Sequence, residues 1–444
     1  MMIVHPIDYR YGTPQMKRIW SEDSKIKRMV RVEVAILKAL AKKGYLDEKL
    51  VDKVKKETLK INPERVKQIE AEIKHDIMAL VKAISEVAGE ASRWVHFGAT
   101  SNDITDTATA TQLRDSFMVL EVKMRKFLKL LIKKAEEYKD VVCLGRTHGQ
   151  AALPTTYGFR FAIWASEAGR HYIRMQQLKE RLIVGKFSGA VGTQAALGDD
   201  GIEIEEEVMR ILGLRPAIIS SQIMPRDIYC EYLEFLSNLA TTLEKIATNF
   251  RILQRAEVAE LWEKFEEKQV GSSTMPHKRN PIDSENICGL ARVVRGFVEP
   301  QHQSSILWEE RDLTNSSAER ITLLESTILV DHILSKMNRI LESISLNLNN
   351  IKRNIEMQKG LNMSEAVMIA LTRKGMGRQE AHEVVRGVSL KTKTTLFEEL
   401  INDEEVKRHL SDDEIEKILK PENYTGTARK KIEVVVRWIK SLLT

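Results

Sequence analysis

Apolar residues recur along most of the chain at the spacing of one buried helix face. In the clearest example, the apolar positions are three or four residues apart throughout: Phe117, Leu120, Met124, Phe127 and Leu131. The same spacing recurs over 236–253 and 333–355. Because an α-helix completes a turn about every 3.6 residues, this alternation gathers the apolar side chains on one side. The pattern predicts a mainly α-helical protein.

Proline is scarce, so long stretches of the chain permit uninterrupted helices. The ten prolines leave four such stretches: 64–153, 155–215, 226–275 and 301–420. Proline would otherwise break a helix by removing a backbone donor and clashing with the preceding turn. Within the third stretch we expect a helix over most of 226–268, which would be about 60 Å long at about 1.5 Å per residue.

A helix of that length cannot bury its apolar stripe alone, so we expect an elongated bundle that other subunits complete. A monomeric coiled-coil spacer is the alternative, but irregular glycine-containing loops between the helices favour a packed bundle. The predicted fold class is all-α, an elongated long-helix bundle flanked by two smaller helical domains. We place the N-terminal helical domain at 1–99, the central bundle at 100–345 and the C-terminal helical domain at 346–444.

Local signals for other structures are few. The apolar run at 141–144 has no apparent hairpin partner with tight-turn chemistry, so we expect no hairpin there. A helix is expected to carry the apolar stripe from Ile69 to Ile84, with His75 off that stripe and outside the core. Ser411 and Glu414 have the spacing of a capping box that opens a short helix.

Composition narrows the function classes. The 69 basic and 63 acidic residues give a net charge of +6 and are interspersed, which is typical of a solvated surface. A nucleic-acid-binding helical protein, which would need its cations on one face, is the weaker alternative. With three cysteines, no long apolar run and no leader-like start, we expect a cytoplasmic protein without membrane contact. Metal-binding and nucleotide-cofactor motifs are lacking, so no cofactor is expected.

One loop concentrates unusual chemistry. Residues 271–281 read Gly-Ser-Ser-Thr-Met-Pro-His-Lys-Arg-Asn-Pro, in which two prolines forbid a regular helix. A serine hydroxyl is a poor base unless its alkoxide is stabilised, which Lys278 and free backbone N–H groups could do. Taken alone, the segment is more typical of a surface loop between helices.

This loop closely resembles the signature of the fumarase/aspartase superfamily of lyases, G-S-S-x-M-P-x-K-x-N-P. The segments 96–103 and 145–154 resemble two further regions of that superfamily, in the same order. Within it, the chain resembles the adenylosuccinate lyases over essentially its whole length. The supporting segments are Arg10-Tyr11, Lys74-His75-Asp76, 308–312, 316–320, 360–365 and 374–376.

The resemblance implies a fumarase/aspartase-like fold and a β-elimination on a small-molecule substrate. Adenylosuccinate would give AMP and fumarate, and the purine intermediate SAICAR would give AICAR and fumarate. Removing the proton beside a carboxylate builds negative charge on that carboxylate, which fixed cations and N–H donors must stabilise. We also expect a homotetramer with active sites shared between subunits. The segments near residues 100, 148 and 272 lie at the ends of predicted helices that are too long for one chain to bring these segments together.

Residue roles follow from the same resemblance. Ser272 would be the base, Lys278 and Asn280 would bind the substrate carboxylate, and His148 would be the acid that protonates the leaving nitrogen. Spacing does not separate Ser272 from Ser273, which stays an alternative base. His148 considered alone is more typical of a structural histidine bonded to a carbonyl.

Further residues are expected to bind or support the substrate. Glu285 would orient a histidine, although an exposed helical glutamate fits as well. Each arginine, considered alone, is an ordinary surface charge. The remaining substrate-binding candidates are Arg10, Tyr11, Lys74, His75, Asp76, His96, Thr100, Ser101, Thr147, Gln222, Arg311, Ser316 and Arg320. An argininosuccinate lyase-like enzyme and a non-catalytic helical scaffold, like the lens crystallins derived from this superfamily, are the competing interpretations.

Overall fold

The computed structural model describes residues 4–265, 271, 274–275 and 277–444. Helices dominate it, which confirms the predicted all-α class. Contacts divide the chain into two compact units. Unit 1 comprises residues up to Lys123, His171–Thr241 and Gly289–Leu334, and unit 2 comprises Met124–Arg170, Thr242–Cys288 and Ser335–Thr444. The predicted division at 1–99, 100–345 and 346–444 stays a prediction.

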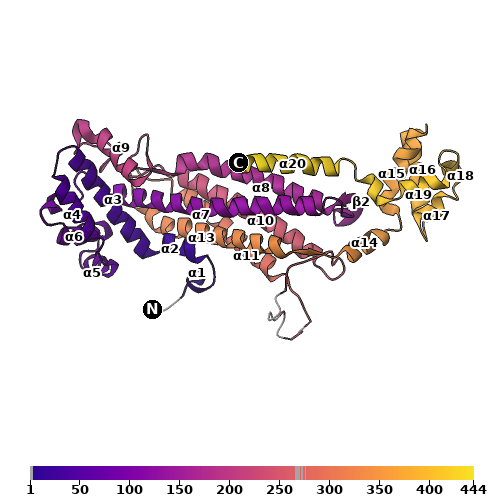
Figure 1. Ribbon diagram of the computed structural model, residues 1–444, viewed down its shortest axis with the longest axis horizontal. Coiled ribbons are helices and arrows are strands. Elements are labelled where there is room, and N and C mark those ends of the chain that lie inside the picture. Colours follow the sequence, from indigo (N-terminus) through magenta and orange to yellow (C-terminus); the bar gives the residue numbers. More distant parts are fainter. Residues whose placement is uncertain (1–3, 266–270, 272–273, 276) are drawn as a thin grey trace. The chain divides into compact units, whose positions relative to one another are not determined.

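The N-terminal part of unit 1 is a cluster of helices around α3 (Figure 1). The apolar face of α3 is buried against α4 and α9, and α5 packs against α6. Short strands β3 and β4 pair in parallel. The elements that lie wholly in this unit are α1 (Pro6–Tyr9), α2 (Pro14–Trp20), α3 (Glu22–Lys42), α4 (Glu48–Thr58), α5 (Pro63–Ile73), α6 (Asp76–Ala88), η1 (Gly89–Trp94), β3 (Val184–Gly185), η2 (Gly198–Asp200), α9 (Gly201–Leu212), β4 (Arg215–Pro216) and α12 (Val298–Gln303).

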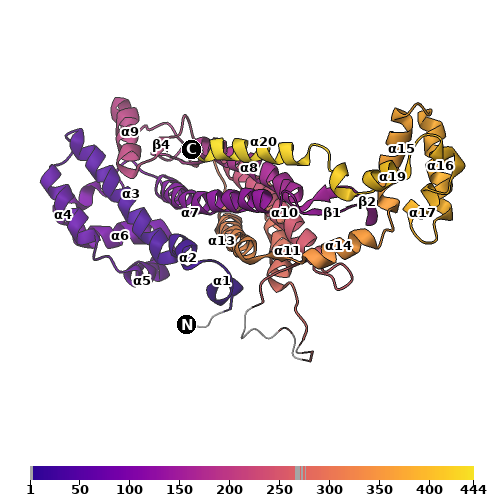
Figure 2. The same ribbon diagram turned by 45° about the vertical axis from the view of Figure 1, so that its right-hand side comes forward.

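Unit 2 contains two antiparallel strand pairs and the C-terminal helices. Helices α15, α16, α17 and α19 gather around one apolar cluster that includes Val367, Leu371 and Leu400 (Figure 2). The elements that lie wholly in this unit are β1 (Val142–Thr147), β2 (Gln150–Thr156), β5 (Leu261–Trp262), β6 (Ser345–Leu346), α14 (Leu348–Glu356), η3 (Leu361–Met363), α15 (Ser364–Arg373), α16 (Arg378–Lys391), α17 (Leu396–Leu400), α18 (Glu404–Lys407), α19 (Asp412–Ile418), η4 (Pro421–Tyr424) and α20 (Ala428–Leu443).

Long helices contribute residues to both units. They are α7 (Ser101–Glu137), α8 (Tyr157–Leu182), α10 (Asp227–Leu253), α11 (Ile282–Gly296) and α13 (Thr314–Ser343). The 37 residues of α7 span about 55 Å at about 1.5 Å per residue. The predicted stripe from Phe117 to Leu131 is buried along this helix, which confirms that its three-and-four spacing marks the core face.

The helix expected over most of 226–268 is present but ends earlier than its predicted length of about 60 Å requires. Helix α10 ends at Leu253, and Leu261–Trp262 forms strand β5, which pairs with β6. The chain turns because the Glu260 amide donates back to the Leu253 carbonyl and Ala259 takes a left-handed φ of 46°. The periodic stretch 333–355 is likewise divided into α13 and α14 by β6. Apolar spacing records burial, and it does not show where the backbone changes direction.

The expected absence of a hairpin at 141–144 is also wrong. Strand β1 pairs with β2 in antiparallel register from Val142–Thr156 to Thr147–Gln150. The two turn residues, His148 and Gly149, have φ of 53° and 75°, the positive values that a two-residue turn of type I′ requires. Histidine is an uncommon residue for that position, although it is enriched in the left-handed region, so the turn was missed.

Gly145 shapes the same hairpin. The register shifts between Leu144 and Arg146, so the strand bulges at Gly145. A Cβ atom on Gly145 would lie 2.5 Å from the Leu153 carbonyl oxygen. Only glycine therefore permits the close approach of the two strands at this point.

The helix expected to run from Ile69 to Ile84 is two helices. Helix α5 ends at Ile73, because Lys74 takes a left-handed φ of 57°. His75 then caps α6, accepting a hydrogen bond from the Met78 amide at 3.2 Å through Nδ1. His75 is exposed, as expected of a residue outside the core. The capping box of Ser411 and Glu414 is confirmed at the start of α19.

Candidate active site

A polar cavity of about 510 Å³ lies in unit 1, where the α5–α6 junction meets the first turns of α7 and α13. Seven of the predicted substrate-binding residues line it: Lys74, His75, Asp76, Ser101, Arg311, Ser316 and Arg320. They come from three segments far apart in the chain. Arg320 forms an ion pair with Asp76 at 3.2 Å, so two of the predicted groups neutralise each other in this state.

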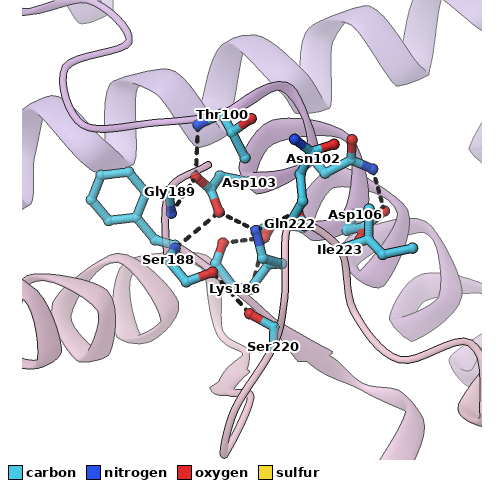
Figure 3. Close-up of polar contacts among 12 residues, drawn as sticks. Thr100, Asn102, Asp103, Asp106, Lys186, Ser188, Gly189, Ser220, Gln222 and Ile223 are labelled. Atoms are coloured by element: carbon cyan, nitrogen blue, oxygen red, sulfur yellow. Dashed lines mark hydrogen bonds and ion pairs between the residues drawn. The ribbon is translucent and has the colours of Figure 1, made fainter. Parts of the chain in front are cut away.

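Asp103 organises the start of α7 (Figure 3). Its carboxylate is fully buried and accepts from the backbone amides of Thr100 at 2.8 Å, Ser188 at 2.9 Å and Gly189 at 3.0 Å. The bond to Thr100 closes the first turn of the helix, as in a capping box. Asp103 thereby fixes the predicted residues Thr100 and Ser101 against the 186–189 loop.

Lys186 supplies the charge that Asp103 needs. Its side chain is fully buried, and its Nζ donates to Asp103 at 2.5 Å and to the Gln222 carbonyl at 2.9 Å. A buried carboxylate is tolerated only when it is paired and hydrogen-bonded. The pair therefore joins the start of α7, the 186–189 loop and the Gln222 segment (Figure 3).

Arg311 is positioned by one side chain from the start of α7 and one from the Gln222 segment. Its guanidinium donates to Asn102 at 2.7 Å and to Gln222 at 3.2 Å. Its Nε is buried and has no hydrogen-bond partner in the described part of the chain. Burial lowers the pKa of Arg311, with the charge of Arg226 adding to that effect. A buried donor without an acceptor in a cavity is suited to an anionic ligand.

A buried charge cluster forms one side of the cavity. Arg226 donates two hydrogen bonds to Asp106 at 2.8 and 3.0 Å and a third to Glu319 at 2.9 Å. Burial opposes ionisation of Asp106, but the charge and hydrogen bonds of Arg226 outweigh it and keep the pKa of Asp106 low. Burial raises the pKa of Glu319. Arg226 is thus occupied by two carboxylates, whereas the buried Nε of Arg311 has no partner among the described residues.

His96 forms a pair with Glu33 of α3, whose side chain is fully buried. The Glu33 carboxylate contacts His96 Nδ1 at 2.7 Å and accepts from the His96 amide at 3.1 Å. Burial disfavours the charged imidazole, but the hydrogen bond and charge of Glu33 outweigh it, so the pKa of His96 lies above its usual value. His96 is not among the residues that line the cavity.

Arg10 and Tyr11 also lie outside the cavity lining. Arg10 is exposed and ends α1, where its amide donates to the Pro6 carbonyl. The Tyr11 ring packs edge-on against His332 of α13, with ring centroids 5.4 Å apart. The structure thus does not bring these two predicted residues to the cavity.

Unit 2 carries the predicted acid His148, the signature segment and the predicted residues near them. Thr147 and His148 are exposed at the tip of the β1–β2 hairpin, and Glu285 is exposed on α11. Lys278 is exposed, whereas Asn280 is half-buried and donates to the Gly271 carbonyl at 2.9 Å. The predicted base Ser272 and its alternative Ser273 lie outside the described residues.

Gly271 is required at the start of the signature segment. A Cβ atom at this position would lie 1.7 Å from the Lys278 carbonyl oxygen. The close approach of Gly271 to Lys278, together with the Asn280 bond, brings the two ends of the segment together. Gly271 and the Asn280 side chain thus each have a local structural role in this segment.

Sequence reasoning missed Asp103, Lys186, Asp106, Arg226 and Glu33. One local signal was present, because Thr100 and Asp103 have capping-box spacing. The others had none, since their partners are far away in the chain.

Comparisons with known proteins decide the family. A model of a family described as lyase matches residues 8–296, and a model described as adenylosuccinate lyase C-terminus matches residues 360–435. An adenylosuccinate lyase of Archaeoglobus fulgidus is 72% identical over 445 residues, covering 100% of both chains. The chain belongs to the adenylosuccinate lyase family. As a member of the adenylosuccinate lyase family, it is a lyase, and the predicted resemblance is confirmed.

Solved structures share the fold of this adenylosuccinate lyase family member. A fumarate lyase from Mesorhizobium sp. BNC1 matches with a TM-score of 0.89 and 30% identity, covering 96% of this chain and 98% of that chain. A 3-carboxy-cis,cis-muconate lactonizing enzyme from Pseudomonas putida matches with a TM-score of 0.92 and 29% identity, covering 99% of each. Since these names denote different reactions, the fold alone does not select the substrate.

Membrane-crossing helices and metal-binding clusters are both absent from the part of the chain that the structure describes. Among the described residues, no helix is both long and apolar enough to cross a membrane. Within the same residues, no three or more His, Cys, Asp and Glu side chains are grouped so that they could hold a metal ion. The three cysteines are free and buried.

Proposed function

We propose that the chain eliminates fumarate from adenylosuccinate, giving AMP, and from SAICAR, giving AICAR. In each reaction a base removes a proton from the succinyl carbon beside the carboxylate, the C–N bond breaks, and an acid protonates the leaving nitrogen. Membership of the adenylosuccinate lyase family supports this assignment. The single observation that carries it in the structure is the buried, unpartnered Nε of Arg311 in a cavity lined by predicted substrate-binding residues.

The roles within this proposal follow the family resemblance. Ser272 is the base, Lys278 and Asn280 bind the carboxylate on which charge develops, and His148 is the acid. Two features support His148. Its ring is exposed, and it occupies a left-handed turn position that asparagine or glycine would fill at lower cost. Side chains that hold a strained backbone position often do so for function.

We further propose a homotetramer in the cytoplasm, with active sites shared between subunits. Large apolar side chains beside Arg311 are left exposed, including Ile306 at 72%, Trp308 at 81% and Leu313 at 69%. A cluster of this kind is unfavourable in water, and another subunit would cover it. Light scattering coupled to size exclusion is the direct check on the number of subunits.

The assignment is tested by following fumarate release from adenylosuccinate, SAICAR and argininosuccinate with the purified protein. Release from the first two substrates alone is the expected result.

In the His148→Gln variant, we expect kcat to fall by about 100- to 10,000-fold on both substrates, because the leaving nitrogen loses its proton donor. Fumarate release from argininosuccinate would contradict the proposed substrates. Full turnover by His148→Gln would contradict the assignment of His148 as the acid.

Replacing Arg311 is expected to weaken substrate binding more than it slows chemistry. An Arg311→Met variant loses charged donors to an anionic group, so KM for adenylosuccinate should rise by about 10- to 100-fold. The matched control is Arg386→Met, which removes an exposed arginine paired with Glu383 on α16. Steady-state kinetics of both variants make the comparison, and an equal KM in the two would refute a binding role for Arg311.

A further inference from the structure

Glu260 is a buried acid that the proposed reaction does not use. It lies in the connection between α10 and β5, and its side chain is fully buried. Glutamate is rarely buried unless it is paired. Burial raises the pKa of Glu260, but hydrogen bonds from Arg146, Tyr157 and Asn354 outweigh this and leave the pKa below its usual value. The side chain is therefore a carboxylate with strong donors around it.

One of those donors lies on the hairpin that carries His148, and a second lies directly after it. Arg146, on β1 and two residues before His148, donates to Glu260 at 2.6 Å. Tyr157, the residue directly after β2, donates its hydroxyl to the other carboxylate oxygen at 2.5 Å. The Glu260 carboxylate thus accepts hydrogen bonds from a residue on β1 and from the residue that follows β2. An isolated two-stranded hairpin is marginally stable, so the position of its tip depends on such tertiary contacts.

Glu260 is itself anchored on its other side by α14, which lies beside β1 (Figure 2). Asn354 of α14 donates from its amide both to Glu260 and to the Val258 carbonyl, each at 2.8 Å. Asn350, one turn earlier, donates to the Ala259 carbonyl at 2.9 Å. The carboxylate therefore sits on a backbone segment that α14 holds in place, and it connects that segment to the hairpin.

We propose that Glu260 is a positioning residue for the elimination, acting through Arg146 and Tyr157 to hold the hairpin so that His148 reaches the leaving nitrogen. The inference rests on the proposed role of His148. Glu260 itself touches no reacting atom in this scheme. Proton transfer requires donor and acceptor within hydrogen-bond reach, and a displacement of about 1 Å can cost about 100-fold in rate.

The test is a cycle of variants with Glu260→Gln and His148→Gln. Glutamine keeps the shape and one acceptor oxygen but removes the charge that Arg146 requires. We expect Glu260→Gln alone to lower kcat by about 10- to 100-fold with KM changed by less than about threefold. In the His148→Gln background, the same change is expected to lower kcat by less than about twofold, because residues that act as a unit are not additive.

Matched variants separate positioning from general loosening. Lys352→Met removes an exposed lysine of α14 that pairs with Glu356, and it should leave kcat within about twofold of the parent enzyme. Arg146→Met, at a side chain that is 22% exposed, repeats the experiment if Glu260→Gln does not fold. Thermal midpoints and circular dichroism of every variant verify that the compared proteins are folded.

The outcomes distinguish this inference from the function on which it rests. If Glu260→Gln and Arg146→Met lower kcat by the same factor with and without His148, or leave kcat unchanged, the positioning role is overturned. If His148→Gln retains full turnover, the acid assignment fails and the inference fails with it. A large loss in the His148-containing enzyme that disappears in His148→Gln supports both.

Discussion

A Ser272→Ala variant is expected to lose about 100- to 10,000-fold in kcat while still binding adenylosuccinate. The succinyl proton is weakly acidic, and without the hydroxyl no positioned base removes it. Binding should persist, because the cations and donors proposed to hold the substrate are untouched. Stopped-flow or steady-state absorbance gives kcat, and calorimetry with the inactive variant gives the affinity.

The neighbouring hydroxyl provides the control for that experiment. Ser273→Ala changes the same segment by the same atom, so it should retain kcat within a few-fold of the parent. If the large loss follows Ser273→Ala and not Ser272→Ala, the base is Ser273. Retained turnover in both single variants and in the double variant would remove a serine base from the mechanism.

Loss of the Lys186 amine should cause the largest loss of stability. In Lys186→Met the Asp103 carboxylate stays fully buried without its cation, and breaking such a pair costs about 3–5 kcal/mol of unfolding free energy. Denaturant titrations at one fixed protein concentration measure the change, since association with other subunits also contributes to apparent stability.

Lys42→Met is the comparison for that titration. Lys42 pairs with Glu207 at 2.9 Å, but its side chain is 62% exposed. Exposed pairs contribute about 0–1 kcal/mol, so this variant should unfold almost as the parent does. If both substitutions lower the free energy of unfolding equally, burial of the Lys186–Asp103 pair does not increase its contribution to stability.

The Lys186→Met substitution also tests whether the buried pair positions Arg311 in the cavity. Lys186 joins the start of α7 to the Gln222 carbonyl, and Gln222 in turn accepts from Arg311. Folded Lys186→Met protein should therefore show a raised KM, through displacement of Arg311, even though Lys186 does not line the cavity. We expect stability and substrate binding to change together, because the Lys186–Asp103 pair both stabilises the fold and positions Arg311.

Local periodicity predicted the helices well because burial repeats with the helical turn. The stripe from Phe117 to Leu131 is the buried face of α7, as its spacing indicates. Failures occurred where a residue other than glycine takes a positive φ and the backbone changes direction. Lys74, His148 and Ala259 all take positive φ, a conformation for which their side chains give little signal. These three positions end a helix, turn a hairpin and redirect the chain after α10.

The amino-acid sequence by itself determined the helical class, the family and the candidate residues, because burial spacing and the catalytic segments are written locally along the chain. Tertiary structure alone decided which buried charges meet. Asp103 and Lys186 are 83 residues apart, and Arg146 and Glu260 are 114 apart. Pairing of this kind depends on the cost of burying an unpartnered charge, which is set by packing in three dimensions and leaves no periodic trace in sequence.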